Sequence, residues 1–199
     1  FSLPDTWELF RNTTVIAVGK IVAGTLASLT FALLLHEVRA EWFKRSVQSL
    51  TYLPHFLSWM IFGGILIDML STRGLINDII AAVGLPRQFF LGKPGLFQPT
   101  VILTEVWKEF GWGAVIYLAA LTGIDPTLYE AAAVDGANRW RRLLHVTLPG
   151  ISSTIVLLAT LSLGDVLNAG FEQILVLSNP AVYSTGDILD TYVYRAGLL

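Results

Sequence analysis

The sequence predicts an all-α, polytopic membrane protein, and two observations lead to this prediction. Hydrophobic residues make up 54% of the 199 residues, while charged residues make up 14%. Soluble domains carry about 25% charged residues, so this chain has too little polar surface to fold in water by itself. Apolar segments also recur along it at the length of about 20 residues that a helix needs to cross the bilayer.

Four apolar segments have the length of a membrane span. They run over residues 12–35, 53–70, 100–121 and 148–167. Glycine and other small residues recur in them, which is typical of membrane helices that pack closely. We expect residues 1–199 to form a single transmembrane domain, and we expect the whole protein to have one further span on each side of it.

The segments between the spans differ in positive charge, and this difference predicts the orientation. Residues 36–50 and 122–147 carry more basic residues, for their length, than the segments on the other side of the membrane. The positive-inside rule therefore places the linker 122–147 in the cytoplasm and residues 71–98 and 168–199 outside. The basic residues on the cytoplasmic side are Arg39, Lys44, Arg45, Arg139, Arg141 and Arg142.

The linker itself has the signals of two short helices. Asp125 is a favourable N-cap, and Pro126 fits the first helical turn. Gly136 permits the positive φ that ends a helix, and a second helix can begin near Asn138. A third helix, amphipathic and short, is predicted outside over Leu75–Val83.

The linker also resembles the EAA motif of permease subunits in bacterial type I ABC importers. Glu-Ala-Ala stands at 130–132, Gly136 follows, and Val146, Leu148 and Pro149 end the motif with the family's spacing. Val146 in place of isoleucine is the one departure. Three further stretches resemble the branch that imports oligosaccharides and polysaccharides: Thr51–Trp59, Trp107–Trp112 and Asn179–Arg195.

This resemblance implies a permease subunit of a bacterial inner membrane that forms the path for an oligosaccharide, including acidic ones such as alginate. It implies a second homologous permease, two ATPase subunits that bind ATP and Mg²⁺, an extracytoplasmic solute-binding protein and membrane lipids as partners. It leaves open which sugar is carried, which permease holds it and whether the permease pair is a homodimer or a heterodimer. The residues implied for ATPase coupling are Glu130, Ala131, Ala132, Asp135, Gly136 and Arg139.

Four charged residues inside the predicted spans point to a translocation path. A charge at mid-membrane costs about 2.5–3.5 kcal/mol, so each should have a partner or face a polar cavity. We expect Lys20 to pair with Glu105 or Glu109 across two helices; a fixed ion pair without substrate contact is the alternative. Aromatic rings can stack on sugars. The candidate path residues are Lys20, Trp59, Glu105, Trp107, Lys108 and Glu109.

Other functions are less well supported by the sequence. There is no phosphate-binding loop or hydrolase motif, so we expect neither an enzyme nor a cofactor in this chain. The three histidines lack the spacing of metal ligands, and a net charge of −2 without a basic tract argues against nucleic acid. An ion-coupled secondary transporter, with Lys20, Glu105 and Glu109 as its relay, remains the alternative function.

Overall fold

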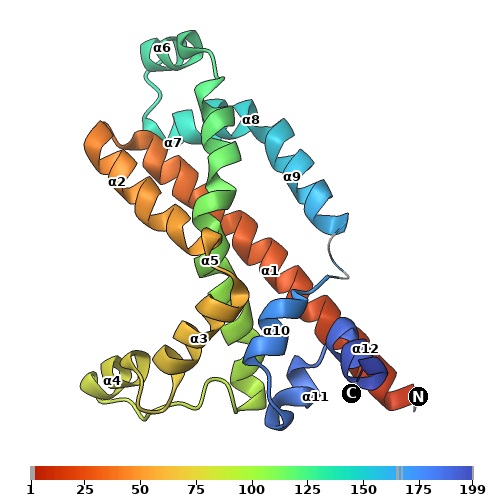
Figure 1. The fold of residues 1–199 in the computed structure, drawn as a ribbon. Helices are drawn as coiled ribbons and strands as arrows, with labels where there is room; N and C mark the ends of the chain where they lie inside the picture. The colour runs from red at the N-terminus through yellow and green to blue at the C-terminus, as the bar shows by residue number, and fades with distance from the viewer. Residues whose placement is uncertain (1–2, 165, 167, 199) are drawn as a thin grey trace.

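The computed structural model describes residues 3–164, 166 and 168–198, and every regular element in this part of the chain is a helix. Two long helices, α1 (Leu3–Glu37) and α5 (Pro94–Thr122), cross near the middle of the molecule (Figure 1) and share its most extensive contact. They approach closely because α5 has Gly113 at the crossing, where a Cβ would lie 2.6 Å from Oγ of Ser28. All the other helices are arranged around this pair.

The remaining helices separate toward the two ends of the pair. In chain order before α5 they are α2 (Glu41–Tyr52), the 3₁₀ turn η1 (Leu53–Phe56), α3 (Trp59–Leu70) and α4 (Leu75–Ala82). After α5 come α6 (Pro126–Val134), α7 (Arg139–Arg142), the π-helical turn η2 (Leu143–Thr147), α8 (Leu148–Gly150) and α9 (Ser152–Gly164). The chain ends in α10 (Phe171–Leu177), the 3₁₀ turn η3 (Pro180–Val182), α11 (Tyr183–Gly186) and α12 (Leu189–Leu198).

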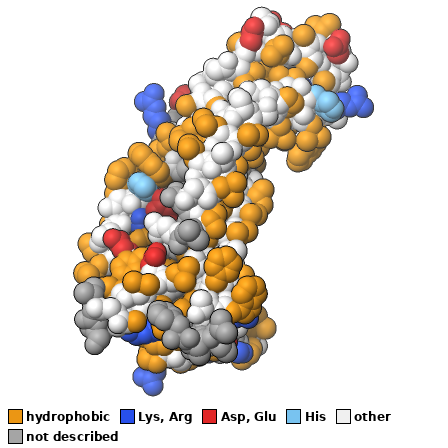
Figure 2. All heavy atoms as spheres, turned by 90° about the vertical axis from the view of Figure 1, so that its right-hand side faces the viewer, with side chains coloured by type: hydrophobic (Ala, Val, Ile, Leu, Met, Phe, Trp, Pro, Cys, Tyr) orange, Lys and Arg blue, Asp and Glu red, His pale blue; other side chains and the backbone are white. Residues whose placement is uncertain are grey.

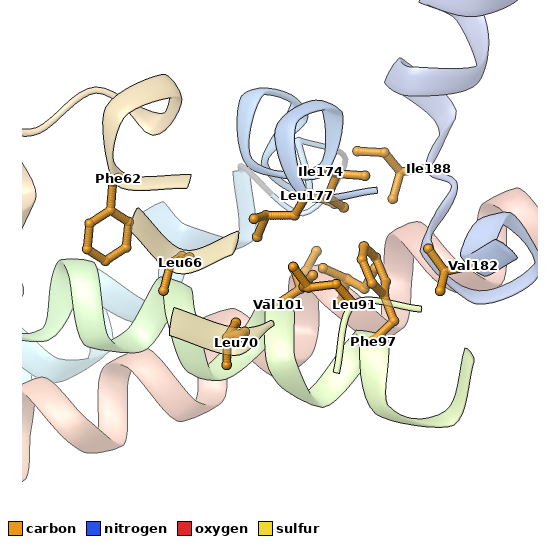
Figure 3. Close-up of a cluster of buried hydrophobic side chains, with 13 residues drawn as sticks. Phe62, Leu66, Leu70, Leu91, Phe97, Val101, Ile174, Leu177, Val182 and Ile188 are labelled. Carbon is orange, nitrogen blue, oxygen red and sulfur yellow. The ribbon is translucent and has the colours of Figure 1, made fainter. Parts of the chain in front are cut away.

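The larger of two buried clusters ties α3, α5 and α10 together at the end where both termini lie (Figures 1 and 3). Phe62 and Leu66 of α3, Phe97 and Val101 of α5 and Ile174 of α10 are all at most 2% exposed. Burial of each such side chain contributes about 1.5–3 kcal/mol. A second cluster packs α1, α5 and Ile151 toward the other end: Ala32, Ala114, Tyr117, Leu121 and Ile151. Both clusters hold α5 as the central helix.

Two predicted segments fold differently from expectation. The predicted span 53–70 is interrupted, because η1 contains Pro54 and α3 begins only after Ser58, whose hydroxyl accepts a hydrogen bond from the amide of Ile61 at 3.4 Å. The basic segment 36–50, treated as a connecting loop, contains most of α2. By contrast, α4 lies where the amphipathic helix was predicted over Leu75–Val83.

The predicted span 148–167 is bent near its beginning. The helical stretches Arg139–Gly150 and Ser152–Gly164 meet at 58°. Residues 165 and 167, at the end of this predicted span, lie outside the described residues. The predicted spans 12–35 and 100–121 lie within α1 and α5, which both extend beyond them.

Two described stretches are long and apolar enough to cross a membrane, Thr6–Glu37 and Trp59–Ala82, and the bent pair could form a third. Helix α5 has the length of a span but is less apolar, because it contains Glu105, Lys108 and Glu109 within two turns. These charged residues therefore need partners inside the protein.

Candidate functional site

Lys20 of α1 and Glu105 of α5 form the ion pair that the sequence predicted. Nζ of Lys20 lies 3.4 Å from Oε2 of Glu105, and the two side chains are 10% and 25% exposed. The same Nζ donates a hydrogen bond to the carbonyl oxygen of Ala169 at 2.7 Å, just before α10. The ammonium is thus held by two separate parts of the chain. The sequence could not predict the contact with Ala169, because its acceptor is a backbone carbonyl, which every residue type carries.

This pair opens onto a cleft between α1, α5 and α9, which we call the central cleft. One cavity of about 230 Å³ is lined by Lys20, Glu105, Glu109 and Asn168 among others. A second, of about 250 Å³, shares Lys20 and Glu109 with it and adds Trp112. Oε2 of Glu105 is buried and accepts no hydrogen bond from any residue that the structure describes. The charged partner of this same oxygen is the Lys20 ammonium at 3.4 Å, and a carboxylate oxygen with one long contact can also accept a hydrogen bond from a hydroxyl in the cleft.

The other two intramembrane charges of α5 belong to a separate cluster with η1. Lys108 is 5% exposed, and its Nζ lies 2.9 Å from Oε1 of Glu109 and 3.0 Å from the carbonyl oxygen of His55. Oε2 of Glu109 lies 2.7 Å from Nδ1 of His55. Glu109 therefore has its own partners, and Lys20 pairs with Glu105. His55 belongs to η1, the turn that contains Pro54, and this turn holds its ring beside Glu109.

Aromatic rings pack on this second cluster. The His55 ring stacks on Trp112, with centroids 4.6 Å apart and planes 5° from parallel. Lys108 Nζ lies 5.5 Å from the centroid of Trp59, within the range of a cation–π contact. The ring centroids of Trp107 and Phe62 lie 5.2 Å apart. Trp107 also lines an apolar groove between α1 and α5 that is separate from the central cleft.

Of the six candidate path residues, the structure brings three to the central cleft. Lys20, Glu105 and Glu109 line it, while Trp59, Trp107 and Lys108 lie outside its lining. Figure 2 shows a few acidic, basic and histidine side chains partway down a face that is otherwise mostly hydrophobic. Among the described residues, no group of three or more histidine or acidic side chains is arranged to hold a metal ion.

The predicted pair of linker helices forms at the opposite end from the termini (Figure 1). Oδ1 of Asp125 accepts a hydrogen bond from the amide of Thr127 at 2.9 Å and caps α6. Gly136 adopts φ of +74°, and the side chain of Asn138 caps α7 through the amide of Arg141 at 2.9 Å. These signals were predicted from the sequence and are confirmed.

Helix α6 stands away from the bundle, and among the described residues one side-chain hydrogen bond connects the two. The hydroxyl of Tyr129 lies 3.0 Å from Oγ1 of Thr147 in η2. Val134, at the end of α6, is 88% exposed. Ala132 is partly buried, and the other residues implied for coupling are exposed: Glu130, Ala131, Asp135, Gly136 and Arg139.

An all-helical fold with apolar spans, a polar cleft between long helices and a protruding helix at one end defines a membrane transport component. The chain belongs to the family described as binding-protein-dependent transport system inner membrane component, whose profile matches residues 21–197. The predicted family and fold class are thereby confirmed.

Two curated relatives from Bacillus subtilis (strain 168) match the whole chain. Protein LplB is 42% identical over 199 residues, and the polygalacturonan/rhamnogalacturonan transport system permease protein YteP is 44% identical over 199 residues. The chain spans 63% and 62% of the lengths of these two proteins.

Two solved structures have the same fold. One is a bacterial ABC transporter involved in the import of the acidic polysaccharide alginate, with a TM-score of 0.93, 38% identity and coverage of 98% of this chain and 68% of that one. The other is a bacterial alginate ABC transporter in complex with an alginate pentasaccharide-bound periplasmic protein, with a TM-score of 0.94, 38% identity and coverage of 100% and 69%.

Proposed function

We propose that this chain is a permease subunit of an ATP-driven importer in a bacterial inner membrane and that it forms part of the path for an acidic oligosaccharide. Its partners are a second homologous permease, two ATPase subunits that bind ATP and Mg²⁺ and an extracytoplasmic solute-binding protein. The observation that carries this proposal is α6, an exposed, capped helix with the family's EAA spacing at one end of the molecule. The relatives offer no support for the ion-coupled alternative.

Coupling works through α6 in this proposal. The ATPase subunits hold the exposed face around Glu130 and Ala131, and their closure on ATP carries α6 with them. The Tyr129–Thr147 hydrogen bond passes the displacement to η2 and hence through α8 to α9, which lines one side of the central cleft. Such a displacement shifts the permease between inward-open and outward-open states only if the contacts differ between them.

The central cleft suits a sugar. Lys20 provides a positive charge, Glu105 and Glu109 provide carboxylate acceptors for hydroxyls, and Trp112 provides an aromatic ring in the lining. Sugars offer hydroxyl donors and an apolar ring face, so this combination fits them. The names of YteP and of the alginate transporters refer to acidic polysaccharides. We therefore propose oligosaccharides of uronic acids as the substrate class.

The proposed orientation follows the charge of the loops. The linker 122–147 lies in the cytoplasm, residues 71–98 and 168–199 lie outside, and the chain crosses the membrane several times. The two stretches long enough to span, together with the bent pair and α5, support a multi-pass arrangement.

The test is reconstitution of the complete importer in liposomes. Uptake and ATP hydrolysis are measured in the presence of the binding protein. The solutes compared are oligosaccharides of equal length from alginate, from polygalacturonate and, as the neutral case, from cellulose. We expect the acidic oligosaccharides to stimulate hydrolysis and to be taken up, and the neutral ones to do neither. In Glu130→Lys we expect stimulation to be lost, whereas Glu41→Lys, an exposed acidic residue of α2 outside α6, retains it.

Two outcomes would overturn the proposal. Equal stimulation by neutral and acidic oligosaccharides would exclude the substrate class. Loss of uptake on adding a proton uncoupler, while ATP stays high, would instead support the ion-coupled alternative.

A further inference from the structure

A small basic pocket lies between the end of α1, helix α6 and helix α7. It encloses about 150 Å³. Three arginines contribute to it from two separate parts of the chain, Arg39 from the α1–α2 connection and Arg139 and Arg142 from α7. The full lining is Glu37, Arg39, Tyr129, Arg139, Arg142, Leu143 and Thr147.

The positive charge of this pocket is not neutralised within the described residues. None of the five ion pairs that the structure contains there involves Arg39, Arg139 or Arg142. Glu37 is the one acidic side chain of the lining, which leaves a formal surplus of two positive charges. Guanidinium groups brought together in this way repel one another unless an anion lies between them.

The uncharged polar groups of the pocket also suit an anion. The hydroxyls of Tyr129 and Thr147 lie in the lining and are hydrogen-bonded to each other at 3.0 Å, so when Thr147 donates to Tyr129 the Tyr129 hydroxyl can donate to an oxygen of the anion. Arginine forks match the oxygens of a phosphate in pairs. We propose that this pocket binds a phosphate group, and that the group is the headgroup phosphate of an anionic phospholipid.

The surroundings of the pocket favour a lipid over a free anion. Trp140, which lies between Arg139 and Arg142 in α7, is 72% exposed, and Leu144 of η2 is 54% exposed. On the α1 side, Trp42 follows Arg39 closely and is 73% exposed. Exposed tryptophans beside arginines are typical of a membrane–water interface, and basic pockets of this kind between membrane helices bind anionic headgroups.

A bound phosphate would connect the α1–α2 turn to α7 and thereby hold the linker at the membrane surface. This inference concerns a lipid site at the base of the linker and does not depend on which solute is transported.

The test counts lipids on the purified complete importer by native mass spectrometry after titration with phosphatidylglycerol, with phosphatidylcholine or with inorganic phosphate. We expect phosphatidylglycerol to bind preferentially. In the double variant Arg39→Gln/Arg142→Gln we expect its affinity to fall by about tenfold or more, since each of the two basic residues strengthens the binding of an anionic lipid about fivefold. Arg141→Gln, on the same turn but outside the lining, is the matched control and should bind as the wild type does.

A second variant separates a specific loss of lipid binding from a loss caused by misfolding. Arg39→Lys/Arg142→Lys retains the charge without the fork, and we expect an intermediate affinity at an unchanged unfolding temperature. Equal binding of phosphatidylcholine, or an equal loss in Arg141→Gln, would overturn the proposal. If inorganic phosphate saturated the pocket as readily as phosphatidylglycerol does, the bound phosphate would not come from a lipid, and that part of the proposal would be wrong. Unchanged lipid binding with loss of the ATPase subunits would make the pocket a protein contact instead.

Discussion

Lys108 is a buried cation whose surroundings explain how α5 holds a lysine among apolar residues. Its ammonium has a carboxylate at 2.9 Å, a carbonyl at 3.0 Å and the Trp59 ring at 5.5 Å. Lys20 is held differently, by one carboxylate and the Ala169 carbonyl beside an open cleft. The two lysines are therefore expected to have different roles: Lys108 fixes η1 against α5, and Lys20 is available to a substrate.

The first prediction concerns the Lys20–Glu105 pair. Glu105→Gln leaves the ammonium without its carboxylate, and we expect a loss of stability toward the lower end of the about 3–5 kcal/mol that breaking a buried pair costs. Thermal unfolding of the purified complex in detergent measures it. The double variant Lys20→Met/Glu105→Gln should recover much of the loss, because no unpaired charge remains.

Asp78→Asn is the matched control for this prediction. Asp78 pairs with Arg87 at 2.7 Å, but the two side chains are 58% and 44% exposed, and such a surface pair contributes about 0–1 kcal/mol. An equal drop in unfolding temperature for Asp78→Asn and Glu105→Gln would show that the intramembrane pair contributes no more to stability than the exposed pair.

At the scale of the element, α6 depends on its cap. The amide of Thr127 donates to the Asp125 carboxylate, and this hydrogen bond lowers the pKa of Asp125 below the usual range of aspartate. A carboxyl whose pKa is lowered by folding stabilises the folded state above its unfolded pKa, and this contribution is lost as the pH falls through its folded pKa. We therefore expect α6 to fray from its N-terminal end only under strongly acidic conditions.

Hydrogen exchange of the peptide that contains α6, followed by mass spectrometry over a series of acidic pH values, measures this fraying. Asp125→Asn accepts the same hydrogen bond without titrating, so its protection should not change with pH beyond the intrinsic exchange rate. If the asparagine variant frays over the same pH range as the wild type, another group is responsible.

The elements that sequence reasoning predicted well have local signals. Asp125, Gly136 and Asn138 each act on their own backbone neighbours, so their effect can be read without the fold. Helix α2 was missed because its charged residues Glu41, Lys44 and Arg45 marked the segment as a loop, although its apolar residues recur at helical spacing. The contact between Glu109 and His55 could not be predicted, because it depends on how η1 packs against α5.

At the scale of the whole molecule, the Tyr129–Thr147 hydrogen bond links a side chain of α6 to the bundle. In Tyr129→Phe we expect the importer to assemble and to hydrolyse ATP but to transport less solute for each ATP. A hydrogen bond of this kind contributes about 0.5–1.5 kcal/mol, so the loss should be partial. Uptake and hydrolysis measured on the same proteoliposomes give this ratio.

Two further variants test the link. Thr147→Ser retains the hydroxyl and should retain the ratio of transport to hydrolysis. Thr122→Val removes an exposed hydroxyl of α5 that donates a hydrogen bond to the carbonyl oxygen of Ala119 in the same helix, and it should leave the ratio unchanged. An unchanged ratio in Tyr129→Phe would show that the backbone of the linker alone transmits the motion.

The distance along the chain between Lys20 and Glu105 has a consequence for biogenesis. Synthesis proceeds from the N-terminus, so the translocon receives α1 while the ribosome has not yet made Glu105. During that interval the lysine costs about 2.5–3.5 kcal/mol in the lipid, and the apolar length of α1 must outweigh this cost unaided. Arrival of α5 then neutralises the lysine, so a nascent chain that is truncated before Glu105 keeps an unpaired cation inside the membrane.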